Sequence, residues 1–283
     1  MITIINYDTF KQHRHIHKEI DVVTHDGLFH ADEVFSIALL RLFHKNINIV
    51  RTRDKELLRQ AISNKKVFVL DAGFIYNQNM LNFDHHQNDA PDGLSTVSMV
   101  FFYLFPDYNN DLLLKKVYNR LIVGINDWDL GKADRNLAGH PLHLPQLVSA
   151  FNRFGTREQD TQFLKAVDFA YSIVANEMNT AKEILKAEKI WDEKELINTG
   201  IVLLNEHCAF WRTIQGEDKS FKYIIQPDRG NWSVVTADNE QFPLPKISEK
   251  TDGLIFQHKN RFITVFDNAR SAISFANKYL SNN

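Results

Sequence analysis

Short apolar runs that end directly at histidine and aspartate are the feature that most constrains this chain. Three such junctions occur: Ile20–Thr24 before His25-Asp26-Gly27, Val67–Leu70 before Asp71-Ala72-Gly73, and Leu81–Phe83 before Asp84-His85-His86. The length of each run and its polar turn are typical of a buried strand followed by a loop. We therefore predict three strands with chemically reactive residues at their carboxyl ends.

Amphipathic helices separate these strands. Ala31–Phe43 carries apolar residues at three- and four-residue spacing, and Lys55–Ile62 follows a further strand at Ile47–Val50. Strands that alternate with helices predict a parallel sheet covered on both faces. Ligands bind such sheets beyond the carboxyl ends of the strands, where His25 and Asp71 are expected to lie.

The length of the chain suits two unequal domains. We predict an N-terminal extension over residues 1–20, an α/β domain with a parallel sheet over 21–145, and a smaller α+β domain, reached through a helical connection, over 146–283. The boundary is placed at the glycine- and proline-containing stretch Gly131–Pro145. A long helix is expected at Gln159–Ile190, followed by five strands and a last helix at Ala269–Leu280.

Composition limits the possible partners and location. A net charge of −2 removes the whole-chain attraction that a nonspecific nucleic-acid coating protein needs, so any contact with nucleic acid must be local. The single cysteine, Cys208, excludes an internal disulfide framework and fits a reducing compartment. No apolar run is long enough to cross a bilayer. These features predict a soluble, cytoplasmic protein with no membrane partner.

The residue types at the strand ends predict a metal-dependent hydrolase. Imidazole nitrogen and carboxylate oxygen together suit borderline cations such as manganese or zinc. A lone histidine in a loop is usually only hydrogen-bonded, and a lone aspartate after a strand is usually a turn former or a helix cap. Turn formation and helix capping do not readily explain such residues at the carboxyl ends of several parallel strands. His25, His30 and Asp32 can converge at that edge of the sheet.

The same segments resemble the melanocyte proliferating gene exonuclease family, a branch of the DHH phosphoesterases. The resemblance is carried by THDGLFHADEVFSIALL, IVRTRD, VLDAG and FDHHQ, and continues through GIVLLNEHCAFWR and YIIQPDRGNWSVV to the end of the chain. It implies a DHH-type N-terminal domain, a C-terminal substrate-binding domain and two divalent cations, with manganese expected and magnesium as the alternative.

The resemblance also implies a ligand set. One cation would be held by His25, His30 and Asp71. The second would be held by Asp32, Asp71, His85 and an aspartate from the segment Asn126–Asp129, for which we take Asp127, with Asp129 as the alternative. His86 would act on the substrate as a catalytic residue, and Asp84 would orient a histidine. Both would assist attack by a hydroxide that the two cations activate.

Substrate contacts are predicted for three cationic side chains. Arg53 follows the second strand and could bind phosphate or pair with Asp54; His258 and Arg270 could contact substrate or be ordinary surface residues. Family members often carry a glycine pair after a C-terminal strand, whereas the matching stretch here, Phe262–Phe266, has no glycine. This departure weakens the expectation of tight phosphate capture at that loop.

The implied activity is exonucleolytic cleavage of RNA or short oligonucleotides. Two alternatives remain open: a small-molecule phosphatase or pyrophosphatase with the same metals, and a catalytically silent nucleotide-binding relative. The sequence leaves the oligomeric state open, with a homodimer as one option.

Overall fold

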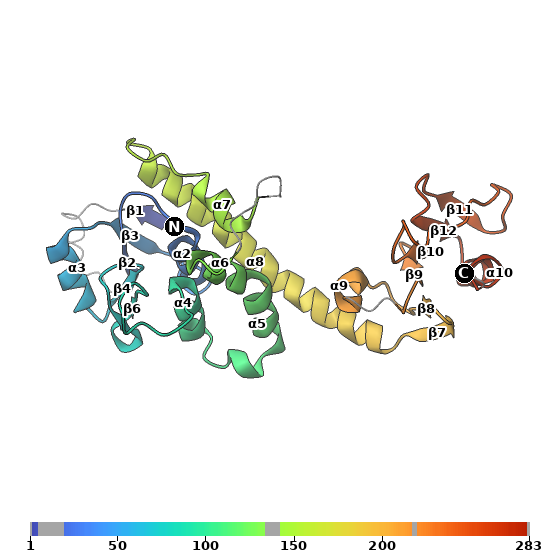
Figure 1. The fold of residues 1–283 in the computed structure, drawn as a ribbon, viewed down its shortest axis with the longest axis horizontal. Coiled ribbons are helices and arrows are strands. Elements are labelled where there is room, and N and C mark those ends of the chain that lie inside the picture. Colours follow the sequence, from blue (N-terminus) through green and yellow to red (C-terminus); the bar gives the residue numbers. More distant parts are fainter. Residues whose placement is uncertain (1, 5–19, 134–141, 217–219, 282–283) are drawn as a thin grey trace. The chain divides into compact units, whose positions relative to one another are not determined.

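The computed structural model of this chain describes residues 2–4, 20–133, 142–216 and 220–281. It divides into two compact units, Met1–Ala181 and Lys182–Asn283. The first is an α/β unit with a mostly parallel sheet, and the second is a smaller unit built on a second sheet (Figure 1). The predicted fold class is confirmed.

The first unit contains a six-stranded sheet. In order across the sheet its strands are β1 (Ile2–Ile4), β3 (Ile47–Arg51), β2 (Ile20–Thr24), β4 (Val67–Leu70), β6 (Asn82–Phe83) and β5 (Tyr76–Asn77). All neighbours pair in parallel except β5 and β6. Strand β1 lies within the predicted N-terminal extension, most of which, residues 5–19, is outside the described residues.

Helices cover both faces of this sheet because the side chains of a strand alternate between them. Val22 packs in a large core with α2 (Ala31–Leu40), α4 (Thr96–Leu104) and the first part of α8 (Gln159–Asp192). Its neighbour Val23 packs on the other face against α3 (Lys55–Ile62), which lies on the opposite side of the sheet (Figure 1). The remaining helices of the unit are α5 (Leu112–Val117), α6 (Val123–Asp129) and α7 (Leu144–Ser149).

The division between the units falls within α8, later than the predicted boundary between residues 145 and 146. The start of α8 belongs to the first unit because its apolar side chains Phe163, Val167 and Val174 are fully buried in the core beside the sheet. Part of the glycine- and proline-containing stretch that suggested a boundary, residues 134–141, lies outside the described residues.

The second unit contains a mixed sheet, with α10 (Ala269–Tyr279) on one face and the end of α8 together with the short α9 (Trp211–Gln215) on the other. Its strands, in order across the sheet, are β11 (Leu254–Gln257), β12 (Ile263–Phe266), β10 (Asn231–Thr236), β9 (Tyr223–Asp228), β8 (Ile201–Leu203) and β7 (Glu195–Asn198). Helix α10 packs Phe275 and Ala276 against this sheet, and α9 precedes β9. Cys208 is buried in this unit, where it packs as a small apolar residue.

Among the described residues, no helix combines the length and the apolar character that a membrane span requires.

Candidate metal centre

Three neighbouring strands deliver the candidate ligands to one edge of the sheet. Strands β2, β4 and β6 lie side by side and run in parallel. Their carboxyl ends are followed by His25, Asp71 and the segment Asp84-His85-His86, respectively. Parallel pairing therefore gathers residues that are up to sixty positions apart in the sequence at a single site, as the sequence predicted.

The loop that carries His25 and His30 is held in place by buried polar contacts. The Arg51 guanidinium donates a hydrogen bond of 2.7 Å to the carbonyl of Gly27 and one of 2.8 Å to Asp160 at the start of α8. Gln159 donates to the same carbonyl, and Asn152 exchanges two hydrogen bonds with the backbone of Phe29. Arg51 is therefore a structural residue, and the loop is preorganised before any cation binds.

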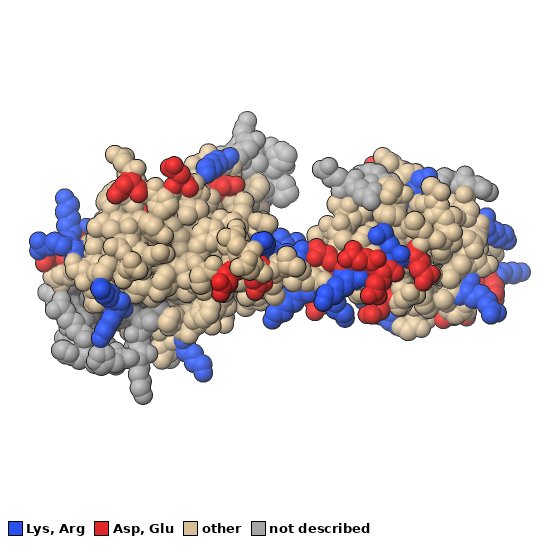
Figure 2. Space-filling model, turned by 90° about the horizontal axis from the view of Figure 1, so that it is seen from below, with Lys and Arg blue, Asp and Glu red and all other residues tan. Residues whose placement is uncertain are grey.

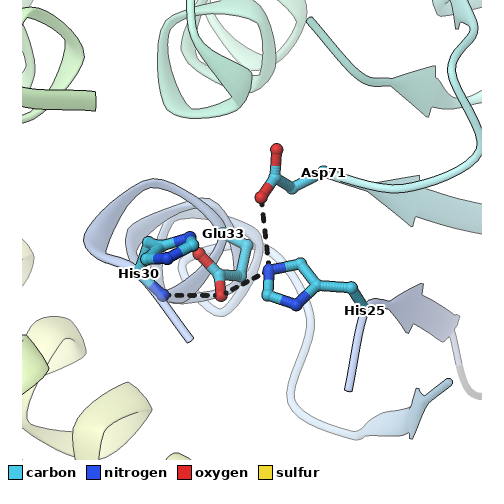
Figure 3. A group of neighbouring side chains, drawn as sticks. All are labelled: His25, His30, Glu33 and Asp71. Atoms are coloured by element: carbon cyan, nitrogen blue, oxygen red, sulfur yellow. Dashed lines mark hydrogen bonds and ion pairs between the residues drawn. The ribbon is translucent and has the colours of Figure 1, made fainter. Parts of the chain in front are cut away.

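His25 presents one ring nitrogen to two carboxylates. Its Nδ1 lies 3.0 Å from the carbonyl of Asp26, and the tautomer that donates this hydrogen bond leaves Nε2 free to bind a cation. That Nε2 lies 3.2 Å from Glu33 Oε1 and 3.3 Å from Asp71 Oδ2. Dashed lines mark both contacts in Figure 3. Burial alone would lower the pKa of His25, but the contacts with Asp71 and Glu33 outweigh it and raise the pKa to about 10.

Glu33 is a member of the site that the sequence analysis did not identify. Its Oε1 accepts a hydrogen bond of 2.8 Å from the backbone N–H of His30, which begins helix α2, and the same oxygen faces His25. The side chain is fully buried, and its Oε2 has no hydrogen-bond partner within the part of the chain that the structure describes. Glu33 therefore combines helix capping with a contact to the cluster through Oε1.

Asp71 stands between two histidines. Its Oδ2 lies 3.3 Å from His25 Nε2, and its Oδ1 lies 3.6 Å from His85 Nε2 and 3.3 Å from the hydroxyl of Thr96. Burial alone would raise the pKa of the Asp71 carboxyl, but the imidazoles of His25, His86 and His85 hold it below its usual range. The two oxygens thus face different partners, as a carboxylate that bridges two cations would require.

The far side of the cluster is formed by Asp32, His85 and Asp129. His85 Nε2 lies 3.2 Å from Asp129 Oδ2. Asp32 is completely buried, and neither of its carboxylate oxygens has a hydrogen-bond partner among the described residues. Burial, together with the charges of Asp71 and Asp129, raises the pKa of Asp32 well above its usual range. A buried carboxylate without a partner is costly unless a cation balances it.

These donors fit divalent cations. Among the described residues, three groups offer ligand atoms that all lie within 4.8 Å of one another: His25, His30, Glu33 and Asp71; Asp71, His85 and His86; and His30, Asp32 and Asp129. Ligand atoms about 2.1 Å from one cation are at most about 4.2 Å apart, so only small side-chain adjustments are needed. Mixed nitrogen and oxygen donors suit manganese or zinc.

Comparison with known proteins identifies the family of this chain. A family model named MYG1_exonuc and described as "Uncharacterised protein family (UPF0160)" matches residues 21–280. The chain belongs to this family.

The MYG1 protein of Schizosaccharomyces pombe is 26% identical over 92% of this chain and 97% of its own length. The MYG1 exonuclease of Rattus norvegicus is 42% identical over 26% of this chain and 19% of its own length. Among solved structures, a pGpG-specific phosphodiesterase from Vibrio cholerae matches with a TM-score of 0.38 and 12% identity, over 92% of this chain and 99% of that one.

Asp127, the aspartate that the sequence analysis preferred, does not join the cluster of this MYG1 family member. Its Oδ1 accepts a hydrogen bond of 3.1 Å from the side chain of Asn126 instead. Asp129, the alternative, occupies the position beside His85. Both residues lie in α6, which continues through Asp129. The structure therefore favours Asp129 as the last ligand.

Asp84 and His86 form a pair beside the metal ligands. Asp84 is buried, and its Oδ1 accepts hydrogen bonds from the ring Nδ1 of His86 at 2.8 Å and from the His86 backbone at 3.0 Å. This bond to Asp84 is the main cause that raises the pKa of His86. The His86 side chain is about half exposed, whereas that of His85 is nearly buried between Asp71 and Asp129. This arrangement suits a ligand role for His85 and a substrate-facing role for His86.

The predicted substrate-binding residues lie in different units. Arg53 is at the edge of the metal cluster, 3.2 Å from His25 Nδ1 and 3.3 Å from Asp26, and is largely exposed. His258 follows β11, and its ring lies against Phe262. Arg270 is in the first turn of α10, where it lines a shallow surface pocket with Lys278. Of the three, Arg53 lies in the same unit as the metal cluster and contacts one of its residues.

The charged surface of this family member fits local recognition. On the face drawn in Figure 2, lysine and arginine side chains lie among aspartate and glutamate side chains, and the described residues form no continuous positive surface there. This pattern agrees with the net charge of −2. It favours substrate contacts confined to a site over broad attraction of nucleic acid.

Proposed function

We propose that this chain is a metal-dependent phosphodiesterase that removes nucleotides from the end of RNA or short oligonucleotides, with two divalent cations, manganese first among them. Membership of a family whose rat member is named an exonuclease supports the reaction class. The observation that carries the proposal is the placement of Asp71 between His25 and His85, one oxygen toward each. Such a shared carboxylate is what a site for two cations requires.

The two ligand sets would meet at Asp71. His25, His30 and Glu33 would complete one set, and Asp32, His85 and Asp129 the other. Bound cations would supply Lewis-acid activation of the phosphate and of an attacking water at neutral pH. Asp32 and Glu33 are buried, so their carboxylates would offer the cations oxygen ligands that are shielded from solvent. Arg53 at the edge of the site would hold a phosphate oxygen with its guanidinium.

His86 would hydrogen-bond to the scissile phosphate or protonate the leaving oxygen. Asp84 would act through His86 as a positioning residue, because it fixes the ring Nδ1 and stabilises the protonated imidazole. Replacing Asp84 with asparagine is expected to lower kcat by about 10- to 100-fold while the manganese content is retained. Turnover and metal content of the purified proteins measure this.

A double substitution separates positioning from a merely structural effect. If Asp84 acts through His86, the combination of Asp84→Asn with His86→Ala lowers kcat no further than His86→Ala alone. Additive losses in the double variant would refute the positioning role. Asp92→Asn, the same change at an exposed residue, serves as the control and should leave kcat within about twofold of the wild type.

A substrate panel tests the proposed activity. With manganese, the full-length chain should release mononucleotides from a short RNA, and a chelator should abolish this release. Phosphate release from pyrophosphate without cleavage of RNA or DNA would instead identify a small-molecule phosphatase. Absence of turnover on every substrate, with metal bound, would identify a silent binding protein. We also propose a cytoplasmic location, which the buried, unpaired Cys208 supports.

A further inference from the structure

A cavity of about 510 Å³ opens beside the metal cluster within the first unit. His25, Asp71 and His86 line it, as do residues of helix α3 and of the loop at residues 72–75, which follows Asp71. This volume is in the range of small-molecule binding sites and is large enough for a nucleoside.

Four of the side chains that line the cavity are large and apolar: Leu58 and Ile62 come from α3, and Phe74 and Ile75 from the loop after Asp71. Arg59 and Ser63 also line the cavity. Phe74 is 69% exposed and Ile75 is 39% exposed, although both are large apolar side chains. Exposed apolar side chains grouped at a pocket beside a reactive centre are typical of a ligand-binding surface. These four side chains cannot form hydrogen bonds or ion pairs with a phosphate group, but they can pack against an aromatic ring.

The loop that presents Phe74 is fixed to α3 and to the reactive centre. Gly73 has a φ of +93°, and a Cβ there would lie 2.7 Å from Ile62, so loop and helix are in close contact. Phe74 itself has a φ of +56°, a conformation that costs energy for a bulky residue. Its backbone N–H donates to Asp84 Oδ2 at 2.6 Å, which holds it in this position. Strain kept in place by a buried carboxylate is characteristic of functional loops.

Asp84 connects this loop to His86. One carboxylate oxygen of Asp84 accepts from Phe74 and the other from His86. The rings of Phe74 and His86 lie 6.2 Å apart between centroids in an edge-to-face arrangement. A ring stacked on Phe74 would therefore lie next to the group that we assign to the scissile phosphate. Arg53 and Lys55 also line the cavity, where they could hold adjoining phosphate oxygens.

We propose that this cavity binds the nucleoside next to the scissile phosphate, with its base stacked on Phe74 against the apolar wall of α3. This inference rests on the proposed function for its reaction, but it concerns base recognition and is tested by binding alone. It predicts that the site selects nucleotides over phosphate compounds without a base. Stacking on an aromatic side chain tolerates every base, so the cavity would recognise a nucleotide without reading its sequence.

Two ligands that differ only in the base provide the test. Adenosine monophosphate and ribose 5-phosphate carry the same sugar and phosphate, so any contact of the phosphate with cations is common to both. We expect the manganese-loaded full-length chain to bind adenosine monophosphate about tenfold or more tightly than ribose 5-phosphate by calorimetry. Phe74→Ala should reduce this preference to less than about twofold. Phe74→Trp, which keeps an aromatic surface, should retain it.

Phe43→Ala is the matched control. Phe43 is 55% exposed, like Phe74, but it follows the C-terminal end of α2, about 15 Å along the helix from His30. Phe43→Ala should leave the preference for adenosine monophosphate over ribose 5-phosphate unchanged. Because Phe74 is exposed and alanine keeps its Cβ, the Phe74 substitution should not affect folding, which circular dichroism verifies.

The outcomes separate base recognition from catalysis. The base-binding proposal is overturned if the wild type prefers adenosine monophosphate over ribose 5-phosphate by less than about fivefold. It is also overturned if Phe74→Ala keeps a preference above about twofold. These binding results hold whether or not the chain hydrolyses RNA. If no substrate in the panel is turned over but the Phe74-dependent preference for adenosine monophosphate is observed, the proposed reaction is rejected and the nucleoside site is retained. If RNA is turned over but that preference is absent, the proposed reaction is retained and the nucleoside site is rejected.

Discussion

An Asp71→Asn protein is expected to lose turnover by about a thousandfold or more and to bind fewer manganese ions per chain than the wild type. Asp71 contacts His25 with one oxygen and faces His85 with the other, so removal of its charge weakens both proposed sets at once. Loss of several kcal/mol of charge stabilisation corresponds to a rate effect of this size. Steady-state kinetics and the metal content of the purified protein measure the two effects.

Asparagine is the appropriate replacement because the backbone at Asp71 is left-handed. Its φ is +51°, which asparagine accepts readily and alanine does not. The asparagine oxygen can still accept from Thr96, so the fold should remain intact. Asp107→Asn makes the same charge change at an exposed turn and should have no effect beyond about twofold. Full metal content and turnover in Asp71→Asn would reject the shared-carboxylate site.

The strand ends could be predicted from the sequence because their signals are local. Val67–Leu70 is apolar throughout and buried throughout, and the polar turn after it marks where the strand stops. Helix α3 was predicted with the observed bounds. In the structure it begins after Asp54, whose side chain caps the helix by accepting a hydrogen bond from the N–H of Leu57. Once strands and helices alternate, parallel pairing places His25 and Asp71 at one edge without further information.

Other features could not be predicted because they depend on tertiary contacts. Glu33 sits at the third position of a helix, where glutamate ordinarily caps the helix start, and here it does so. The contact of Glu33 with the metal cluster depends on how closely His25 approaches its carboxylate, and no local sequence pattern shows this distance. Strand β7 was missed because Glu195–Asn198 is an edge strand with exposed side chains and no clear alternation. Strand β1, only three residues long, gave no recognisable strand signal.

The choice between Asp127 and Asp129 depended on the rotation of one helix. A π-helical segment, Tyr118–Ile122, precedes α6 and changes the direction in which every later side chain points. Asn126 then fixes that rotation, because its Oδ1 accepts from the backbone of Ser95 and from the hydroxyl of Ser98. A residue three positions later lies on the same face of the helix, whereas the next residue is rotated by about 100°. Asp129 therefore lies on the same face of the helix as Asn126, where it meets His85, and Asp127 does not.

The helix rotation predicts unequal effects of two otherwise similar substitutions. Asp129→Asn should lower turnover by about a hundredfold or more, because it removes the carboxylate that lies 3.2 Å from His85 and within ligand distance of Asp32. Asp127→Asn should lower it by no more than about threefold, because the Asp127 carboxylate accepts a hydrogen bond from the side chain of Asn126 and belongs to none of the ligand groups found among the described residues. Turnover with manganese, measured side by side, compares the two.

Each variant is the control for the other, since both remove one negative charge from the same helix two residues apart. A general loss of helix stability or of local charge would affect both alike. A larger loss in Asp127→Asn than in Asp129→Asn would mean that α6 is rotated differently when cations are bound. It would return the ligand role to the residue that the sequence first suggested, whereas equal and small losses would remove α6 from the metal centre altogether.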